Sequence, residues 1–197
     1  MTVNPTLYKK LADNPLTDLV PVVMIADVPN VLVVNPSVPA TTLDDFTTCA
    51  KGNPGQLSYG SSGIGTLSHL SGFVLARRAG FDAAHMPCKG VDALNDLLAG
   101  RLQFMFATIP TVAERGFPGF QAGSWIAVFA PKGTPETVVA MLNKAVNEII
   151  AGREMQAQLT REGADPVDGT PAMLGQFTQK ESEKWRALVR ESSATVE

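Results

Sequence analysis

A run of glycine and hydroxyl residues in the first half of the chain has the residue types and spacing of an anion site. Leu57–Leu70 reads LSYGSSGIGTLSHL, which predicts a short strand, a Gly/Ser turn and the first turn of a helix. Gly60, Gly63 and Gly65 allow positive φ angles and a close approach of backbone N–H groups to a ligand. The helix start adds unpaired N–H groups and a partial positive charge. We therefore expect a site for a small anion.

The hydroxyl groups of Ser61, Ser62 and Thr66 are the side-chain donors expected at this site. A second strand-to-helix junction at Lys89–Asp92 would add a cation. Ligands of open α/β sheets bind at the carboxyl ends of the strands, so two neighbouring junctions would converge on one small negative group. The alternative is a capped turn that binds nothing.

Catalytic patterns are weaker. Gly60–Ile64 lacks the second glycine of a Gly-x-Ser-x-Gly elbow. Ser68 stands where a dinucleotide fingerprint has Gly or Ala, and no phosphate-binding P-loop occurs. Cys88 could pair with His85 or His69 as a nucleophile and base, although a lone cysteine beside a strand is usually an apolar filler. We assign no catalytic residue and no cofactor.

Metal and redox chemistry find little support. The two histidines lack partners at the spacing of metal ligands, so no metal site is expected. Cys49 and Cys88 show no Cys-x-x-Cys pattern, and we favour two free thiols over one disulfide.

Composition limits the class of protein. Of the 197 residues, 45% are hydrophobic and 18% charged, which is typical of a globular chain. A net charge of −3 argues against a nucleic-acid partner. The N-terminus as written lacks a cationic segment followed by an apolar run, so it shows no signal peptide and would leave the chain in the cytoplasm. No stretch approaches the roughly 18 apolar residues of a membrane span.

Strands and helices alternate several times between about residues 31 and 106, which predicts an α/β lobe. Asn4 is expected to cap the first helix, Thr42 or Thr41 a later one, and Thr134 the long helix that Pro135 opens. The expected strands are 20–26, 31–34, 57–60, 83–87, 102–106 and 125–130. The expected helices are 4–11, 42–50, 66–78, 92–100, 112–115, 136–150, 153–162 and 170–190.

Several ordered motifs resemble the Bug/TctC family, the extracytoplasmic solute receptors of tripartite tricarboxylate transporters. The segments that carry the resemblance are Asn4–Leu11, Tyr59–Leu70, Pro87–Gly90, Pro110–Glu114, Gly119–Trp125 and Ala130–Pro135. The resemblance implies a two-lobed periplasmic binding protein of type II that closes over a small mono-, di- or tricarboxylate without catalysis. Membrane components of the transporter are the implied partners, and the periplasm is the implied location.

The resemblance also implies which residues bind the ligand. Family members hold a carboxylate between loops of both lobes through amides, hydroxyls and bridging water. The matching positions of the second lobe are Ser61, Ser62, Gly63, Gly65 and Thr66, joined by Lys89 and Gly90.

Compared with the family pattern, the chain looks incomplete. The signal peptide and about half of the first lobe are missing, and a second gap falls between Phe106 and Thr108. We therefore expect a remnant of the first lobe and hinge at 1–30, the second α/β lobe with the ligand loop at 31–150, and C-terminal helices at 151–197. Strand edges left open at Val20–Ala26 and Val31–Val34 would favour a homo-oligomer.

Two other functions stay open. A shortened chain could serve as an interaction or scaffold module that has lost its ligand, because a half-site cannot close over it. A small hydrolase using Cys88 or Ser62 is the third hypothesis. The sequence does not identify the carboxylate.

Overall fold

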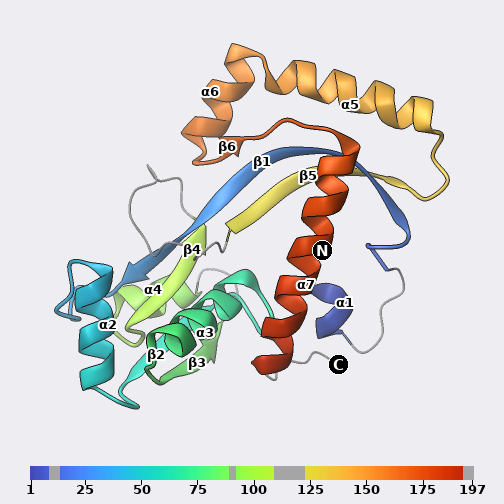
Figure 1. Cartoon of the computed structure of the whole chain (residues 1–197). Coiled ribbons are helices and arrows are strands. Elements are labelled where there is room, and N and C mark those ends of the chain that lie inside the picture. The colour runs from blue at the N-terminus through green and yellow to red at the C-terminus, as the bar shows by residue number, and fades with distance from the viewer. Residues whose placement is uncertain (9–13, 89–91, 109–122, 193–197) are drawn as a thin grey trace. The chain divides into compact units, whose positions relative to one another are not determined.

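The computed structural model describes residues 1–8, 14–88, 92–108 and 123–192 (Figure 1). It has the α/β fold that the sequence predicts, and its sheet is mixed. The chain forms two compact units. Unit 1 contains the described residues of 1–29 and 123–192, and unit 2 contains those of 30–108. Each unit is built around its own part of one long strand, β1 (Leu19–Val34).

The sheet of unit 2 has the strand order β3-β2-β4-β1. β2 (Leu57–Ser61) lies parallel to both β3 (Ala83–Pro87) and β4 (Phe104–Thr108). Residues 30–34 of β1 complete the sheet antiparallel to β4. The carboxyl ends of β2 and β3 therefore meet at one edge of the sheet, where the candidate site lies.

Three helices cover the two faces of this sheet: α2 (Leu43–Gly52), α3 (Leu67–Ala79) and α4 (Asp92–Leu98). Phe104 and Phe106 of β4 pack with residues of α2 and α3, whereas Met105 packs with α4. Because successive side chains of a strand point to opposite faces, α2 and α3 cover one face of the sheet and α4 covers the other. These apolar layers hold the strand ends, and so the loops that follow them, in fixed positions.

The start of α2 has the capping predicted from the sequence. The Thr42 side chain accepts a hydrogen bond from the Asp45 N–H, and the Asp45 carboxylate accepts one from the Thr42 N–H. This reciprocal pair is a capping box, and it satisfies two N–H groups at once.

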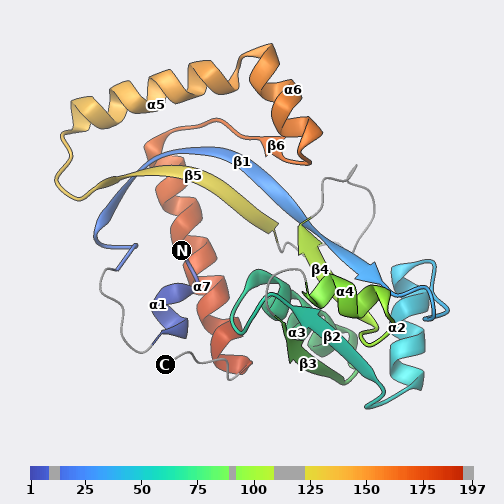
Figure 2. The ribbon, with the colours of Figure 1, turned by 180° about the vertical axis from the view of Figure 1, so that it is seen from behind.

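The sheet of unit 1 pairs the first part of β1 antiparallel with β5 (Gly123–Pro131) and, at two residues, with β6 (Asp165–Pro166). Four helices belong to this unit: α1 (Asn4–Leu7), α5 (Glu136–Ile150), α6 (Arg153–Arg161) and α7 (Pro171–Glu191). The long helix α7 crosses one face of the β1–β5 pair, in front of it in Figure 1 and behind it in Figure 2. Val139 of α5 packs against Val22 and Val23 of β1.

The prediction of two separate strands at 20–26 and 31–34 was wrong, because β1 is continuous. Its partner changes at this point: Pro29 is the last residue opposite β5, and Asn30 is the first opposite β4. Proline has no N–H to donate to a neighbouring strand. Because Pro29 lies where the pairing with β5 ends and the pairing with β4 begins, it interrupts neither set of hydrogen bonds.

Two predicted caps were also wrong. Thr134 Oγ1 donates to the Pro131 carbonyl (2.8 Å), and Pro135 holds the capping position of α5 without a side-chain bond. Val3 rather than Asn4 precedes α1. The predicted helix at 112–115 and the end of the predicted helix 4–11 lie outside the described residues. Within the described part of the chain, no helix is both long and apolar enough to cross a membrane.

Candidate functional site

The loop after β2 and the segment after β3 start side by side, as the sequence predicts. Ser61 lies opposite Pro87 in the parallel pair, and the Cys88 N–H donates to the Ser61 carbonyl over 2.9 Å. Lys89 and Gly90 come next in the chain and lie outside the described residues.

Two glycines of the loop need backbone conformations that other residues rarely adopt. Gly63 has φ 136° and Gly65 has φ 74°. Gly60, for which the sequence also predicted positive φ, lies within β2 instead, and a Cβ there would come within 2.6 Å of Leu102 Cδ1. A positive φ angle is thus needed at Gly63 and Gly65, whereas close packing explains the glycine at position 60.

Ser61 is fully buried beneath the loop, and its hydroxyl is engaged by protein groups. Its Oγ donates to the Gly63 carbonyl (3.0 Å), accepts from the Gly63 N–H (3.1 Å) and lies 2.7 Å from His85 Nε2. The residue shapes the loop from inside.

Thr66 caps α3. Its Oγ1 accepts from the His69 N–H (3.5 Å) and donates to the Gly63 carbonyl (2.7 Å). The side chain therefore joins the helix start to the turn and fixes the direction in which the helix N–H groups point.

Ser62 and Ser68 place two hydroxyls at the open side of the turn. The exposed Ser62 donates its N–H to Ser68 Oγ (3.2 Å), and the two hydroxyl oxygens lie 3.4 Å apart. Ser68 Oγ also lies 3.1 Å from Thr66 Oγ1. Ser68 was not predicted as a site residue, although a serine in the first helical turn after a Gly-rich loop is a usable signal.

Donors for a ligand remain at the start of α3. Within the described residues, the N–H groups of Ile64, Leu67 and Ser68 make no hydrogen bond. The first N–H groups of a helix point along its axis and carry partial positive charge. With the Ser62 and Ser68 hydroxyls they form a donor-rich edge that suits a carboxylate.

Two histidine rings and a tyrosine lie stacked beneath this loop. The rings of His69 and His85 have centroids 3.8 Å apart with 20° between their planes, and Tyr59 lies 5.0 Å from His85. The Gly65 N–H donates to His69 Nδ1 over 3.0 Å. Burial lowers the pKa of His69, while burial and the neighbouring His69 lower the pKa of His85 to about 4. Both rings are therefore neutral near pH 7.

Cys88 does not pair with either histidine. Its Sγ faces the Met86 carbonyl (3.5 Å) and Asp96 Oδ2 (4.0 Å), and burial together with Asp96 and Asp92 raises the pKa of the thiol. A raised pKa disfavours the reactive thiolate. Cys88 and Cys49 are both free thiols, as predicted. No group of three or more potential metal ligands occurs among the described residues.

Comparison with known families decides the class of the protein. The family described as the tripartite tricarboxylate transporter family receptor, TctC, matches residues 1–110 and 103–193. The chain belongs to the TctC family. This is a family of periplasmic solute-binding proteins that bind without catalysis, so the hydrolase hypothesis falls.

Individual relatives agree with this assignment. A protein encoded in the tcbD-tcbE intergenic region of Pseudomonas sp. strain P51 is 33% identical over 97% of this chain, and the match covers 66% of that relative. Among solved structures, Rpa4515 of R. palustris with adipate matches with a TM-score of 0.81 at 29% identity, over 96% of this chain and 74% of that one. MatC of Rhodopseudomonas palustris with bound malate matches with a TM-score of 0.74 at 28% identity, over 93% and 74%. The chain thus spans about two thirds of the Pseudomonas relative.

The alignments also agree with an internal gap relative to the TctC pattern. The alignment with the Pseudomonas relative runs over 222 positions, more than the 197 residues of this chain, so it opens gaps within the chain. The two segments matched to the family overlap at residues 103–110, where the sequence analysis placed a missing segment after Phe106.

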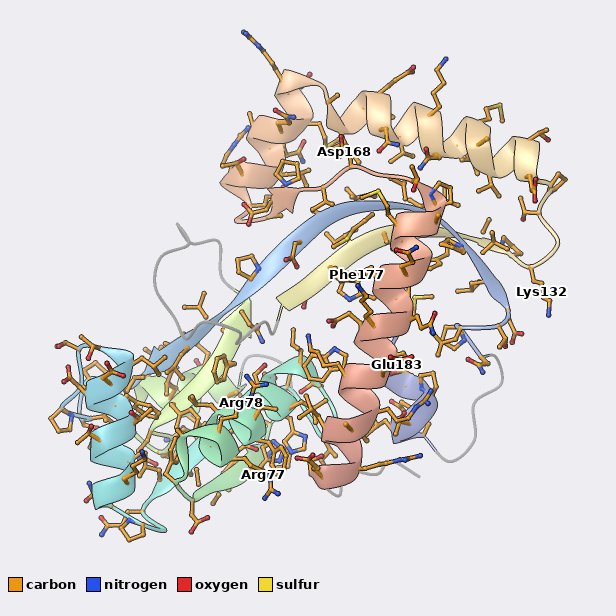
Figure 3. The ribbon with its side chains drawn as sticks, in the orientation of Figure 1. Arg77, Arg78, Lys132, Asp168, Phe177 and Glu183 are labelled. Carbon is orange, nitrogen blue, oxygen red and sulfur yellow. The ribbon has the colours of Figure 1, made fainter. Side chains whose placement is uncertain are left out.

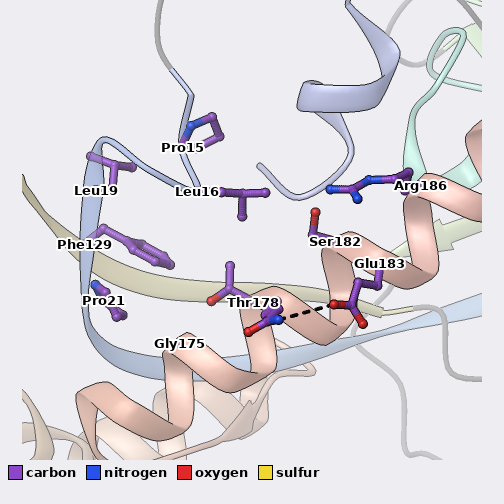
Figure 4. A pocket seen from close by; sticks show the side chains of 11 residues that line it. Pro15, Leu16, Leu19, Pro21, Phe129, Gly175, Thr178, Ser182, Glu183 and Arg186 are labelled. Carbon is purple, nitrogen blue, oxygen red and sulfur yellow. Dashed lines mark hydrogen bonds between the residues drawn. The ribbon is translucent and has the colours of Figure 1, made fainter.

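Unit 1 contains a separate pocket of about 420 Å³ on one side of α7 (Figure 4). Its lining combines apolar side chains of the β1 end and β5 with polar side chains of α7. Ser182 is 3% exposed, and its hydroxyl has no hydrogen-bond partner among the residues that the structure describes. Gln179 Nε2 donates to Glu183 Oε1 over 3.3 Å. The lining residues are Pro15, Leu16, Leu19, Pro21, Phe129, Gly175, Thr178, Gln179, Ser182, Glu183 and Arg186.

Proposed function

We propose that this TctC-family chain binds a small carboxylate at the loop between β2 and α3. The unpaired N–H groups of Leu67 and Ser68, next to the Ser62 hydroxyl, support this most directly. A carboxylate accepts hydrogen bonds only, and an edge rich in N–H and O–H donors matches it. Structural relatives are described with adipate and with malate, so dicarboxylates are the first candidates.

The residues expected from the sequence divide into two roles in this proposal. Ser62 and the helix start carrying Thr66 contact the ligand, together with Lys89 and Gly90 from the neighbouring junction. Ser61, Gly63 and Gly65 hold the shape of the loop, because Ser61 and Gly63 bond to each other and the Gly65 N–H bonds to His69.

We further propose that the chain acts in the periplasm and delivers its ligand to the membrane components of a tripartite transporter. Membership of a receptor family with this description supports the assignment.

Self-association is part of the proposal. Within the described residues, positions 30–34 of β1 pair with β4 only, and β5 pairs with β1 only. Strand edges of this kind favour pairing between copies. Sedimentation velocity tests this, and a monomer at all concentrations would contradict it.

A thermal-shift titration with adipate and malate tests ligand binding. A ligand at 100 times its Kd stabilises the native state by about 2.7 kcal/mol, which raises the melting temperature with dose. The double variant S62A/S68A removes both hydroxyls at the open side of the turn and should abolish or strongly reduce the shift.

Ser37→Ala is the matched control, since Ser37 is an exposed turn residue whose hydroxyl makes no hydrogen bond within the described residues. A shift that persists unchanged in S62A/S68A would place binding elsewhere. A flat response of the wild-type chain to carboxylates at millimolar concentration would favour the ligand-free scaffold.

A further inference from the structure

We propose that His69 is the positioning residue of the ligand loop, and that carboxylate binding is lost when its ring takes up a proton. The inference rests on the proposed function, which it extends to the regulation of the same site. Its starting point is the hydrogen bond from the Gly65 N–H to Nδ1 of His69, a ring that is 6% exposed.

This hydrogen bond fixes the form of the ring. A backbone N–H can only donate, so Nδ1 accepts and the proton of the neutral imidazole is on Nε2. In the protonated ring Nδ1 also carries a hydrogen, which would face the hydrogen of Gly65. The bond is then lost, and two donors oppose each other.

Gly65 lies at the point of the loop where this loss matters. Its left-handed conformation (φ 74°) turns the chain into Thr66, the capping residue of α3. Leu67 and Ser68, whose N–H groups are unpaired within the described residues, come directly after Thr66 in the chain. Releasing Gly65 therefore frees the segment that aims these donors at the ligand.

His85 holds the same loop at a second glycine. Its Nε2 lies 2.7 Å from Ser61 Oγ, and that oxygen accepts from the Gly63 N–H over 3.1 Å. One imidazole thus holds Gly65 directly, and the other holds Gly63 through Ser61. Because the rings stack with centroids 3.8 Å apart, a proton on either ring opposes a proton on the other.

The surroundings offer little to stabilise an imidazolium. Of the strands that pack against α3, β2 brings Tyr59 and β3 brings His85, while β4 has no titratable residue. On α3 itself the charged residues are Arg77 and Arg78 near the far end (Figure 3), about 12 Å along the axis from His69 at 1.5 Å per residue. No carboxylate is present on these four elements in the part of the chain described. Protonation of His69 or His85 therefore destabilises the stacked pair of neutral rings.

The test compares variants of the full chain that differ in titration and in hydrogen bonding. In His69→Asn the amide oxygen takes the place of Nδ1 and accepts from Gly65, but it does not titrate. In His69→Phe the ring remains for stacking and the acceptor is gone. Affinity for adipate is measured by calorimetry at pH 7.5 and pH 5.0, with circular dichroism as a check on folding.

We expect wild-type affinity to fall more between the two pH values than that of H69N, by at most about tenfold for each unit by which the His69 pKa differs between bound and free protein. Adipate itself takes up protons in this range, and that effect is common to both proteins. H69F should bind weakly at both pH values while staying folded. Equal pH profiles for wild type and H69N, or unchanged binding by H69F, would overturn the proposal.

Nitrogen NMR keeps this inference separate from the proposed function. If the wild type binds no carboxylate, the function fails, yet the His69 ring and the Gly65 amide can still be followed through a pH titration without ligand. A Gly65 amide that shifts with the titration of His69 supports the positioning role. A Gly65 amide signal that does not shift as His69 titrates, or a proton on Nδ1 of His69 at pH 7.5, overturns the positioning role.

Discussion

The backbone N–H of Gly65 donates to Nδ1 of His69, four residues further along the chain, over 3.0 Å. A side chain of the first turn of α3 thus reaches back to hold the loop from which the helix starts. The ring can do this because β2 and β3 place Tyr59 and His85 against it. The His69 ring therefore contributes both to the packing against the sheet and to the shape of the loop.

Stability should fall in mild acid. The folded-state pKa of His85 is lowered to about 4 and that of His69 is lowered as well, whereas an exposed histidine titrates near 6.5. Between about pH 6.5 and 4 the unfolded chain takes up protons that the folded chain does not. The free energy of unfolding therefore decreases as the pH falls through this window.

Urea unfolding at pH 7.5, 6.0 and 5.0 measures this slope. The variant H69N/H85Q keeps an acceptor for the Gly65 N–H and an amide near Ser61 Oγ, without a titrating ring, and it should show a flatter profile. Parallel profiles for the two proteins would mean that the histidines do not cause the loss.

Removing the cap of α3 should destabilise the protein even without a ligand. Thr66→Ala deletes the acceptor for the His69 N–H and the donor to the Gly63 carbonyl. A lost N-cap costs about 0.5–2 kcal/mol. Thr66→Ser keeps the hydroxyl and should restore most of this in chemical unfolding; equal losses for both variants would assign the effect to the methyl group.

Helix glycines in the two units should respond in opposite ways to alanine. A Cβ on Gly72 of α3 would lie 2.3 Å from Cε2 of the buried Tyr59 ring, so Gly72→Ala should cost about 1–3 kcal/mol. The nearest atom to a Cβ on Gly175 of α7 is Pro21 Cγ at 3.5 Å, an ordinary contact. Gly175→Ala should stabilise by about 0.5–1 kcal/mol through helix propensity. Melting temperatures that move in the same direction would contradict the packing described.

Two buried serines form a second matched pair. The Ser182 hydroxyl has no partner within the described part of the chain, so Ser182→Ala should be neutral or stabilising by up to about 1 kcal/mol. Ser71 accepts from Asn30 Nδ2 over 3.1 Å, and Ser71→Ala should cost about 1 kcal/mol. Thermal unfolding of both variants checks the signs; a clear loss for Ser182→Ala would show that its hydroxyl is bonded in solution.

The sequence predicted features whose chemistry is local. Thr42 is a cap because a hydroxyl just before an apolar helix serves the first N–H groups, and Gly63 and Gly65 follow from the turn that they make. Alternation of strands and helices was sufficient to predict the α/β lobe.

Features that depend on distant partners were not predicted. The roles of His69 and Ser61 need His85, which β3 brings beside β2. The continuity of β1 depends on an exchange of partner strands at Pro29, where local composition indicates a break. Lys89 remains a prediction.

The amide NMR signals of Leu67 and Ser68 during an adipate titration report on binding at the start of α3 itself. These two amides should shift in a saturable way at pH 7.5, and the shifts should be lost or strongly reduced in S62A/S68A but not in S37A. Saturable binding detected by calorimetry that leaves both amides unmoved would contradict a carboxylate site at the start of α3.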